Sequence, residues 1–274
     1  MAKMQARLYR IAVYAGAAFS VSVLALIVGY ILLKGIPHLT PELFAWEYNS
    51  TNVSMTPAII NTLLMTFLSL IVCVPLGIGA AIWLTEYAPR GSRLVRLVRM
   101  TAETLSGIPS IIYGLFGSLF FVVALKLGLS LLSGALTLSI MVLPTIMRTT
   151  EEALLAVPDS YREGSFGLGA GRLRTTFRVV LPSAIPGILS GVILAIGRIV
   201  GETAALIYTA GTVAKVPGSL LDSTRTLAVH MYTISTEGLH LGQSYATAVV
   251  LLVMVLAING LSALIARKIG GSRA

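Results

Sequence analysis

Six apolar runs dominate this chain of 274 residues, and each is about as long as a bilayer-spanning helix. The hydrocarbon core of a bilayer is about 30 Å thick, which an α-helix crosses with about 20 residues. Only 11% of the residues are charged, whereas a soluble domain carries about 25%. The sequence therefore predicts an all-α, polytopic membrane protein with six transmembrane helices. The expected spans are residues 11–33, 58–84, 107–125, 131–148, 184–209 and 244–266.

The basic residues are distributed unevenly between the two sides of this six-span topology. Fifteen Lys and Arg residues precede the first span, follow the last, or lie between spans 2 and 3 and spans 4 and 5. Four lie on the other side: Lys34, Lys126, Lys215 and Arg225. Because cytoplasmic loops carry the excess of Lys and Arg, we expect both termini in the cytoplasm. The net charge of +9 is thus a topology signal, and no nucleic-acid partner is expected.

A polar segment, residues 151–182, separates the fourth and fifth apolar runs. Within it, Ser160 and Glu163 have the spacing of a capping box, which predicts a helix starting after Ser160. Pro158 prevents a helix from running in from the preceding span. Gly169 can end the new helix in a left-handed conformation. We therefore expect a short helix, a turn and a second amphipathic helix in the cytoplasm, although an ordinary solvated loop with chance capping is the alternative.

The spacing within this segment is similar to that of a known cytoplasmic loop. Permeases of binding-protein-dependent ABC importers carry Glu, two Ala, three residues, Gly, nine residues, Ile, one residue and Leu-Pro. The matching positions here are Glu163, Gly164, Ser165, Gly169, Val179, Leu181 and Pro182. Gly and Ser replace the two Ala, and Val replaces Ile. The chain thus resembles this permease family, which implies a type I importer fold with a coupling loop that docks on a separate ATPase.

Two charged residues, Arg198 and Glu202, fall within the fifth expected span. An ionised side chain at this depth costs several kcal/mol unless it faces a partner or a polar cavity. Continued as one helix, the span places both residues on a stripe of small residues that includes Gly187, Gly191 and Ala195. One interpretation is a structural i,i+4 ion pair that fixes helix packing. The other is a translocation path in which Arg198 acts as a fixed cation for an anion and Glu202 orients or opposes it.

Further segments narrow the resemblance to the PstA-type permeases of the bacterial phosphate importer. The segments that carry it are residues 105–114, 143–154, 197–204 and 227–232, together with the coupling loop. The resemblance implies inorganic phosphate as the substrate and a bacterial inner-membrane location. It also implies three partners: a C-type permease subunit, an ATPase dimer that binds ATP, and an extracytoplasmic phosphate-binding protein. The expected organisation is an N-terminal span and outer loop, residues 1–56, followed by the importer transmembrane domain, residues 57–270.

Several functions are less compatible with the sequence. None of the five lysines precedes Ser or Thr, so a Walker A loop is absent and ATP hydrolysis is expected in another subunit. The three histidines have no metal-ligand spacing, and no cofactor is expected in this chain. The alternatives are a permease for another oxyanion or small solute, an independent secondary transporter, and a purely structural membrane subunit. The turn at residues 107–110 is interpreted as a helix start or kink, with an anion-binding helix N-terminus as the alternative.

Overall fold

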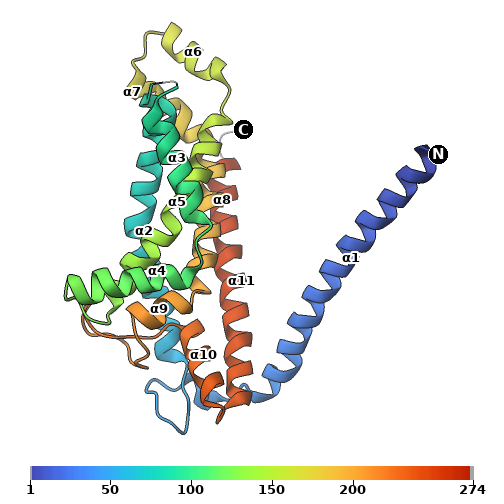
Figure 1. Ribbon diagram of the computed structural model, residues 1–274, viewed down its shortest axis with the longest axis vertical. Helices are drawn as coiled ribbons and strands as arrows, with labels where there is room; N and C mark the ends of the chain where they lie inside the picture. The colour runs from blue at the N-terminus through green and yellow to red at the C-terminus, as the bar shows by residue number, and fades with distance from the viewer. Residues whose placement is uncertain (1, 90, 272–274) are drawn as a thin grey trace.

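The computed structural model describes residues 2–89 and 91–271, and these residues form helices joined by loops, without a strand. Figure 1 shows a bundle of long helices with shorter ones at each end, and α1 diverges from this bundle. The helices are α1 (Ala2–Gly35), α2 (Thr56–Ile82), α3 (Arg93–Ser106), α4 (Ser110–Gly117), α5 (Leu131–Leu155), α6 (Asp159–Gly167), α7 (Arg172–Thr175), α8 (Leu181–Val200), α9 (Ala204–Thr209), α10 (Leu227–Glu237) and α11 (Leu241–Gly271). There are also three π-helical segments in the described residues. One extends α2 (Trp83–Tyr87), one extends α4 (Ser118–Ala124), and one joins α7 to α8 (Thr176–Val180).

Five of the six expected spans are straight, or nearly straight, apolar helices that are long enough to cross a membrane. They are Tyr9–His38, Thr56–Tyr87, Leu131–Leu155, Arg172–Val200 and Leu241–Leu264. The helices extend beyond the apolar runs because polar and charged residues at their ends continue the helical hydrogen bonding. The expectation of an all-α membrane protein is confirmed.

The third expected span, residues 107–125, does not form a single crossing helix. α3 and the α4 segment meet at a bend of 103°, and Figure 1 shows α4 lying across the bundle instead of along it. Gly107 and Pro109 separate the two helices, since proline disfavours helical conformation in the residue before it. The α4 segment, Ser110–Ala124, is only about 22 Å long at 1.5 Å per residue, which is shorter than a bilayer core.

The core of the bundle surrounds α5, which packs against α2 on one side and α8 on the other. Small residues allow these helices to approach closely. A Cβ at Gly77 of α2 would lie 2.8 Å from Ile146 of α5, and one at Gly191 of α8 would overlap Thr149. Ser139 also donates a hydrogen bond of 3.1 Å to the Ser69 carbonyl across the α2–α5 contact. These contacts confirm that the small-residue stripe of the fifth span faces a neighbouring helix.

The fifth crossing helix differs from the expected range of 184–209 at both ends. It begins at Arg172, because α7, the π-helical segment and α8 are continuous. The second amphipathic helix expected near Pro182 is therefore the first part of the crossing helix. At the other end, α8 stops at Val200, and α9 is a separate short helix.

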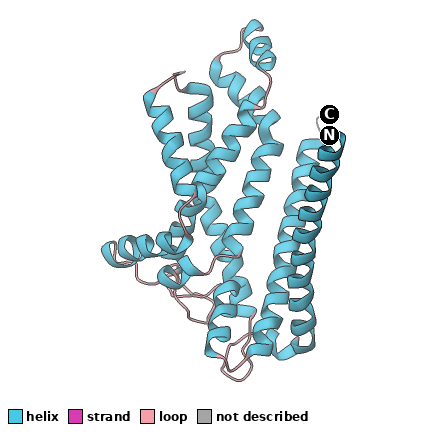
Figure 2. Cartoon of the chain, turned by 45° about the vertical axis from the view of Figure 1, so that its right-hand side comes forward, coloured by secondary structure: helices cyan, strands magenta, loops and turns pink. Residues whose placement is uncertain are grey.

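Both chain ends lie at the same end of the bundle. Figures 1 and 2 show the start of α1 and the end of α11 at the end that carries α6, whereas α10 lies at the opposite end. The broken α3–α4 pair preserves this arrangement, because it enters from the α6 end and leads to α5, which returns to that end. The relative placement of the termini and the 151–182 loop therefore agrees with the six-span topology.

Candidate functional site

The loop that contains Glu163 forms α6, but the expected cap is wrong. α6 begins at Asp159 with Pro158 at the N-cap position, and no side chain caps it. Ser160 therefore lies within the first turn. Its side chain and that of Glu163 make no hydrogen bond to the described part of the chain. Pro158 itself sets the helix start, since its fixed φ and extended ψ of 139° lead directly into the first turn.

The end of α6 confirms the prediction for Gly169. Gly169 has a φ of +80°, in the left-handed region. Its N–H donates to the Phe166 carbonyl at 2.9 Å, and the Ala170 N–H donates to the Ser165 carbonyl at 3.1 Å. These two bonds form the Schellman motif, which satisfies carbonyls that the helix would otherwise leave unbonded. The turn then leads into α7, and the Ser165 and Thr175 hydroxyls join the two helices at 2.8 Å.

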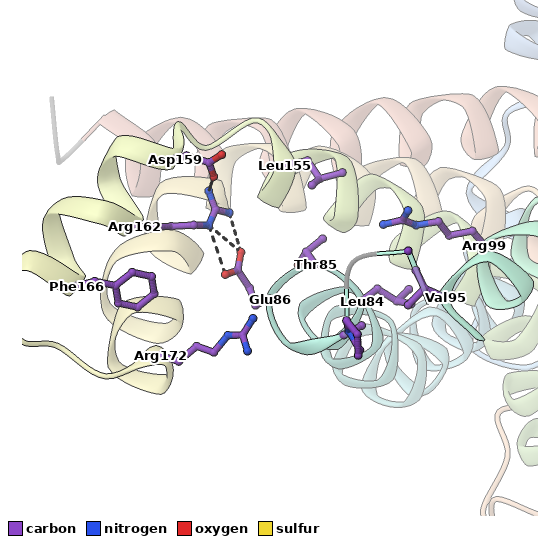
Figure 3. Close-up of a pocket in the computed structure, with 13 residues that line it drawn as sticks. Leu84, Thr85, Glu86, Val95, Arg99, Leu155, Asp159, Arg162, Phe166 and Arg172 are labelled. Atoms are coloured by element: carbon purple, nitrogen blue, oxygen red, sulfur yellow. Dashed lines mark hydrogen bonds and ion pairs between the residues drawn. The ribbon is translucent and has the colours of Figure 1, made fainter. Parts of the chain in front are cut away.

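A buried ion pair fixes α6 to the rest of the bundle. The Arg162 Nη2 atom lies 2.7 Å from the Glu86 Oε1 atom at the end of α2, and the two side chains are 15% and 9% exposed. Arg162 also donates to the carbonyls of Val157 and Leu154 at 2.8 and 2.9 Å. Figure 3 shows the two side chains facing each other at a pocket of about 620 Å³. One guanidinium thus connects α2, the end of α5 and α6.

The sequence interpretation missed this pair. Arg162 is one of the fifteen Lys and Arg residues on the expected cytoplasmic side, and Glu86, its partner, is 76 residues away in the chain. The remaining surface of α6 is exposed and partly apolar: Tyr161 and Phe166 are about half exposed, and Leu168 is 91% exposed. Gly164 has open space around it. Leu181 and Pro182 lie farther along, at the start of α8.

Arg198 lies near the end of α8, because this helix stops earlier than the expected span, and it lines a pocket between α5, α8 and α11. The pocket has a volume of about 590 Å³, and its polar lining residues are Thr145, Ser190, Arg198 and Asn259. In the described part of the chain, the Arg198 guanidinium makes no ion pair. The pocket contains no carboxylate, so its lining carries a net positive charge. Such a lining suits an anionic guest, because a buried cation is stabilised by a nearby negative charge.

Glu202 does not lie on the same stripe as Arg198, and the expected i,i+4 pair is absent. α8 ends at Val200 with Gly201 at the C-cap position. Glu202 is buried, and its Oε1 atom accepts a hydrogen bond of 3.0 Å from the Ala205 N–H at the start of α9. A carboxylate at a helix N-terminus is stabilised by the free N–H groups there. The structure therefore shows Glu202 in a capping contact, which serves the turn between α8 and α9.

A second buried cluster, at the end of the bundle opposite α6, was also missed. Arg225 is 4% exposed, and its guanidinium lies 4.5 Å from the centre of the Tyr48 ring. His230 of α10 packs edge-on against the same ring at 6.0 Å. Burial and the charge of Arg225 lower the pKa of His230 to about 3, so the imidazole is neutral at physiological pH. The sequence showed only an isolated Arg and an isolated His in an outer segment.

Comparisons with known proteins agree with the fold and with the loop. Residues 73–271 match the family described as "Binding-protein-dependent transport system inner membrane component". The chain is 33% identical over 238 residues to the probable ABC transporter permease protein YqgI of Bacillus subtilis, covering 81% of each chain. It is 34% identical over 211 residues to the phosphate transport system permease protein PstA 1 of Mycobacterium tuberculosis, covering 76% of this chain and 69% of the relative.

Solved structures of ABC importers share the fold at low sequence identity. A bacterial alginate ABC transporter, solved in complex with an alginate pentasaccharide-bound periplasmic protein, matches with a TM-score of 0.69 at 15% identity. The match covers 96% of this chain and 94% of that one. The MetNI methionine ABC transporter matches with a TM-score of 0.61 at 21% identity, over 78% and 94% of the two chains. The family match and the relatives identify the chain as a multi-pass member of the binding-protein-dependent transport system inner membrane component family, a permease subunit of an ABC importer.

Proposed function

We propose that this permease subunit forms part of the path for inorganic phosphate, as the A-type partner of a C-type permease. The main observation is Arg198, a half-buried cation that lines a pocket without a carboxylate. The phosphate permease relative from Mycobacterium tuberculosis supports the choice of anion. A guanidinium offers paired donors that match the oxygens of a tetrahedral anion.

An anion in the membrane needs a compensating positive charge. Moving a charged group to the bilayer centre costs about 2.5–3.5 kcal/mol on insertion scales. Arg198 supplies that charge from a rigid helix, and its neighbours Gly197 and Gly201 add no bulk beside it. Glu202, held in its capping contact, positions the turn beyond Arg198.

The remaining subunits of the proposed importer follow from the loop and from the family. An ATPase dimer would dock on α6, where the apolar side chains of Tyr161, Phe166 and Leu168 are exposed. ATP binding and hydrolysis would take place in that dimer. An extracytoplasmic phosphate-binding protein would deliver the anion to the opposite end of the bundle, near α10. Both termini and the 151–182 loop are proposed to be cytoplasmic.

Substitution of Arg198 tests the proposed substrate path. Arg198→Gln keeps an unbranched polar side chain but removes the charge and the guanidinium, so ATP-dependent uptake of radiolabelled phosphate into proteoliposomes should fall roughly 50-fold or more. Arg198→Lys should restore part of the uptake, because it keeps the charge without the paired donors. Lys215→Gln is the matched control, since it removes one exposed outer charge. Normal phosphate uptake by an assembled Arg198→Gln complex would refute the proposal.

A further inference from the structure

The Leu181–Pro182 step of the permease motif follows an irregular turn of the fifth crossing helix. The Leu181 N–H donates to the Thr176 carbonyl, five residues back, and this bond closes the π-helical segment Thr176–Val180. A regular α-helix would bond the same N–H to the Phe177 carbonyl, four residues back. The segment, called the α7–α8 π turn below, therefore holds one extra residue, although α7 and α8 remain continuous.

Pro182 gives the physical reason for this irregular turn. Proline has no N–H, and in an α-helix its ring collides with the carbonyl four residues before it, which here belongs to Arg178. A local π adjustment accommodates a proline without ending the helix. The Phe177 and Arg178 carbonyls then lack the N–H groups that an α-helix would supply. Two missing bonds at one place lower the free energy needed to bend the helix there.

The α7–α8 π turn separates two well-packed parts of the molecule. On one side, the hydroxyls of Ser165 and the buried Thr175 join α6 to α7 at 2.8 Å. On the other side, α8 packs against α5, with Gly191 in contact with Thr149. Bending at the π turn therefore changes the angle between α6–α7 and α8 without repacking either part.

The contact between α6 and α2 has a similar construction. Arg162 of α6 pairs with Glu86, which lies in the π-helical segment Trp83–Tyr87 at the end of α2 (Figure 3). The closing bond of this segment also spans five residues, since the Ala88 N–H donates to its first carbonyl at 2.8 Å, and Pro89 follows. Two of the elements that hold α6 thus contain a π turn next to a proline.

We propose that Pro182 is a positioning residue for energy coupling, and that it maintains a hinge in the α7–α8 π turn. The inference rests on the proposed docking of an ATPase on α6 and adds how movement there reaches the helix that carries Arg198. An importer opens its path to each side in turn, so the tilt of α8 changes while α6 stays docked. A hinge of a few residues can absorb that change. A uniform α-helix would instead tie the angle of the docked α6 to the tilt of α8.

Two substitutions at position 182 test the hinge in the reconstituted permease–ATPase complex. Pro182→Ala supplies an N–H and favours a uniform helix, so the phosphate transported per ATP should fall at least about fivefold, the factor that one hydrogen bond contributes to an equilibrium. Pro182→Gly also supplies the N–H but keeps the turn weak, because glycine disfavours helix. It should retain more than half of the parent ratio, although it lacks the proline ring as well.

Pro186→Ala is the matched control. It makes the same substitution four residues farther along, at a proline inside the regular part of α8. The phosphate transported per ATP should stay at the parent value, because the α7–α8 π turn and Pro182 are unchanged.

Hydrogen exchange of the same complexes measures the hinge directly. The amides of residues 177–181 should exchange at least about tenfold more slowly in Pro182→Ala than in the parent, because a uniform helix opens less often at this place. The amides of α6 should exchange at the same rate in both proteins.

The outcomes separate this inference from the proposed function. An unchanged exchange rate or an unchanged phosphate-to-ATP ratio in Pro182→Ala would overturn the hinge, as would a lower ratio in Pro182→Gly than in Pro182→Ala. Equal losses in Pro182→Ala and Pro186→Ala would overturn it too, and each of these results would leave the docking on α6 intact. An ATPase that protects no amide of α6 from exchange in the parent complex would overturn the proposed docking, and the inference with it.

Discussion

At the scale of single residues, the Arg162–Glu86 pair holds α6 against the bundle. Removing one partner of a buried pair costs about 3–5 kcal/mol, because the other charge remains buried and unpaired. We therefore expect Arg162→Met to lower the thermal stability of the complex and to weaken the stimulation of its ATPase by substrate. The double variant Glu86→Leu/Arg162→Met should recover most of the stability but not the stimulation.

Arg148→Gln, which breaks an exposed pair with Glu152, is the control and should change stability by less than about 1 kcal/mol. Equal losses in the single and double variants would contradict the assigned role.

His230 gives a second prediction at this scale. The pKa of His230 is about 3 in the folded protein and about 6.5 in an unfolded chain. At a pH between these two values, the imidazole is therefore protonated only in the unfolded state. Stability should therefore fall by up to about 1.4 kcal/mol per pH unit as the pH drops below about 6.5. Thermal unfolding of the complex at pH 7.5 and pH 5.0 measures this loss. His230→Gln should reduce the difference between the two unfolding temperatures, whereas His240→Gln, in the loop between α10 and α11, should leave it unchanged.

At the scale of elements, the Schellman turn fixes the direction in which α6 leaves the bundle. Nothing lies within 4 Å of a Cβ at Gly169, so a side chain there would have space but the wrong backbone conformation. Gly169→Val should lower the stability of the turn by more than the roughly 1–2 kcal/mol that an ordinary L-residue loses in the left-handed conformation, because a β-branched side chain strongly disfavours positive φ. We expect ATP hydrolysis to continue with less phosphate transported per ATP. Gly167→Ala is the control, because Gly167 lies inside α6 and also has open space around it, and it should transport normally. An equal amount of phosphate transported per ATP in the two variants would exclude a coupling role for the turn.

Sequence patterns predicted these elements well where one local rule decided the structure. Gly169 was found from its spacing, and five spans from their apolar length. The direction of α4 could not be predicted, because an apolar run has the same composition whether it lies along or across the bundle. Glu202 was misplaced because the helical period was extended past Gly201, and a break of a few residues changes the face on which later residues lie. The Arg162–Glu86 contact depends on tertiary packing between distant segments, which a single sequence does not reveal.

At the scale of the whole molecule, the fold places α6 and the 210–226 segment at opposite ends of the bundle (Figure 1). The excess of Lys and Arg at the α6 end predicts that this end faces the cytoplasm. Cysteines at Ser165 and Ser219, in a Cys73→Ala background, should therefore react with a membrane-impermeant maleimide from opposite sides of oriented vesicles. Cys73 is buried, so its removal serves only to exclude background labelling.

The broken α3–α4 pair makes this experiment decisive for the topology. If the pair acts as one crossing, α5 returns to the cytoplasmic end and six crossings place Ser165 and Ser219 on opposite sides. If the α3–α4 pair did not reach the far side, α5 would start on the cytoplasmic side and carry the 151–182 loop to the opposite side. The loop could then not dock on a cytoplasmic ATPase. A cysteine at Leu129, which is exposed beyond the end of the α4 segment, separates these cases. It should be labelled from the same side as Ser219, and labelling from the side of Ser165 would show that the bent pair does not span the membrane.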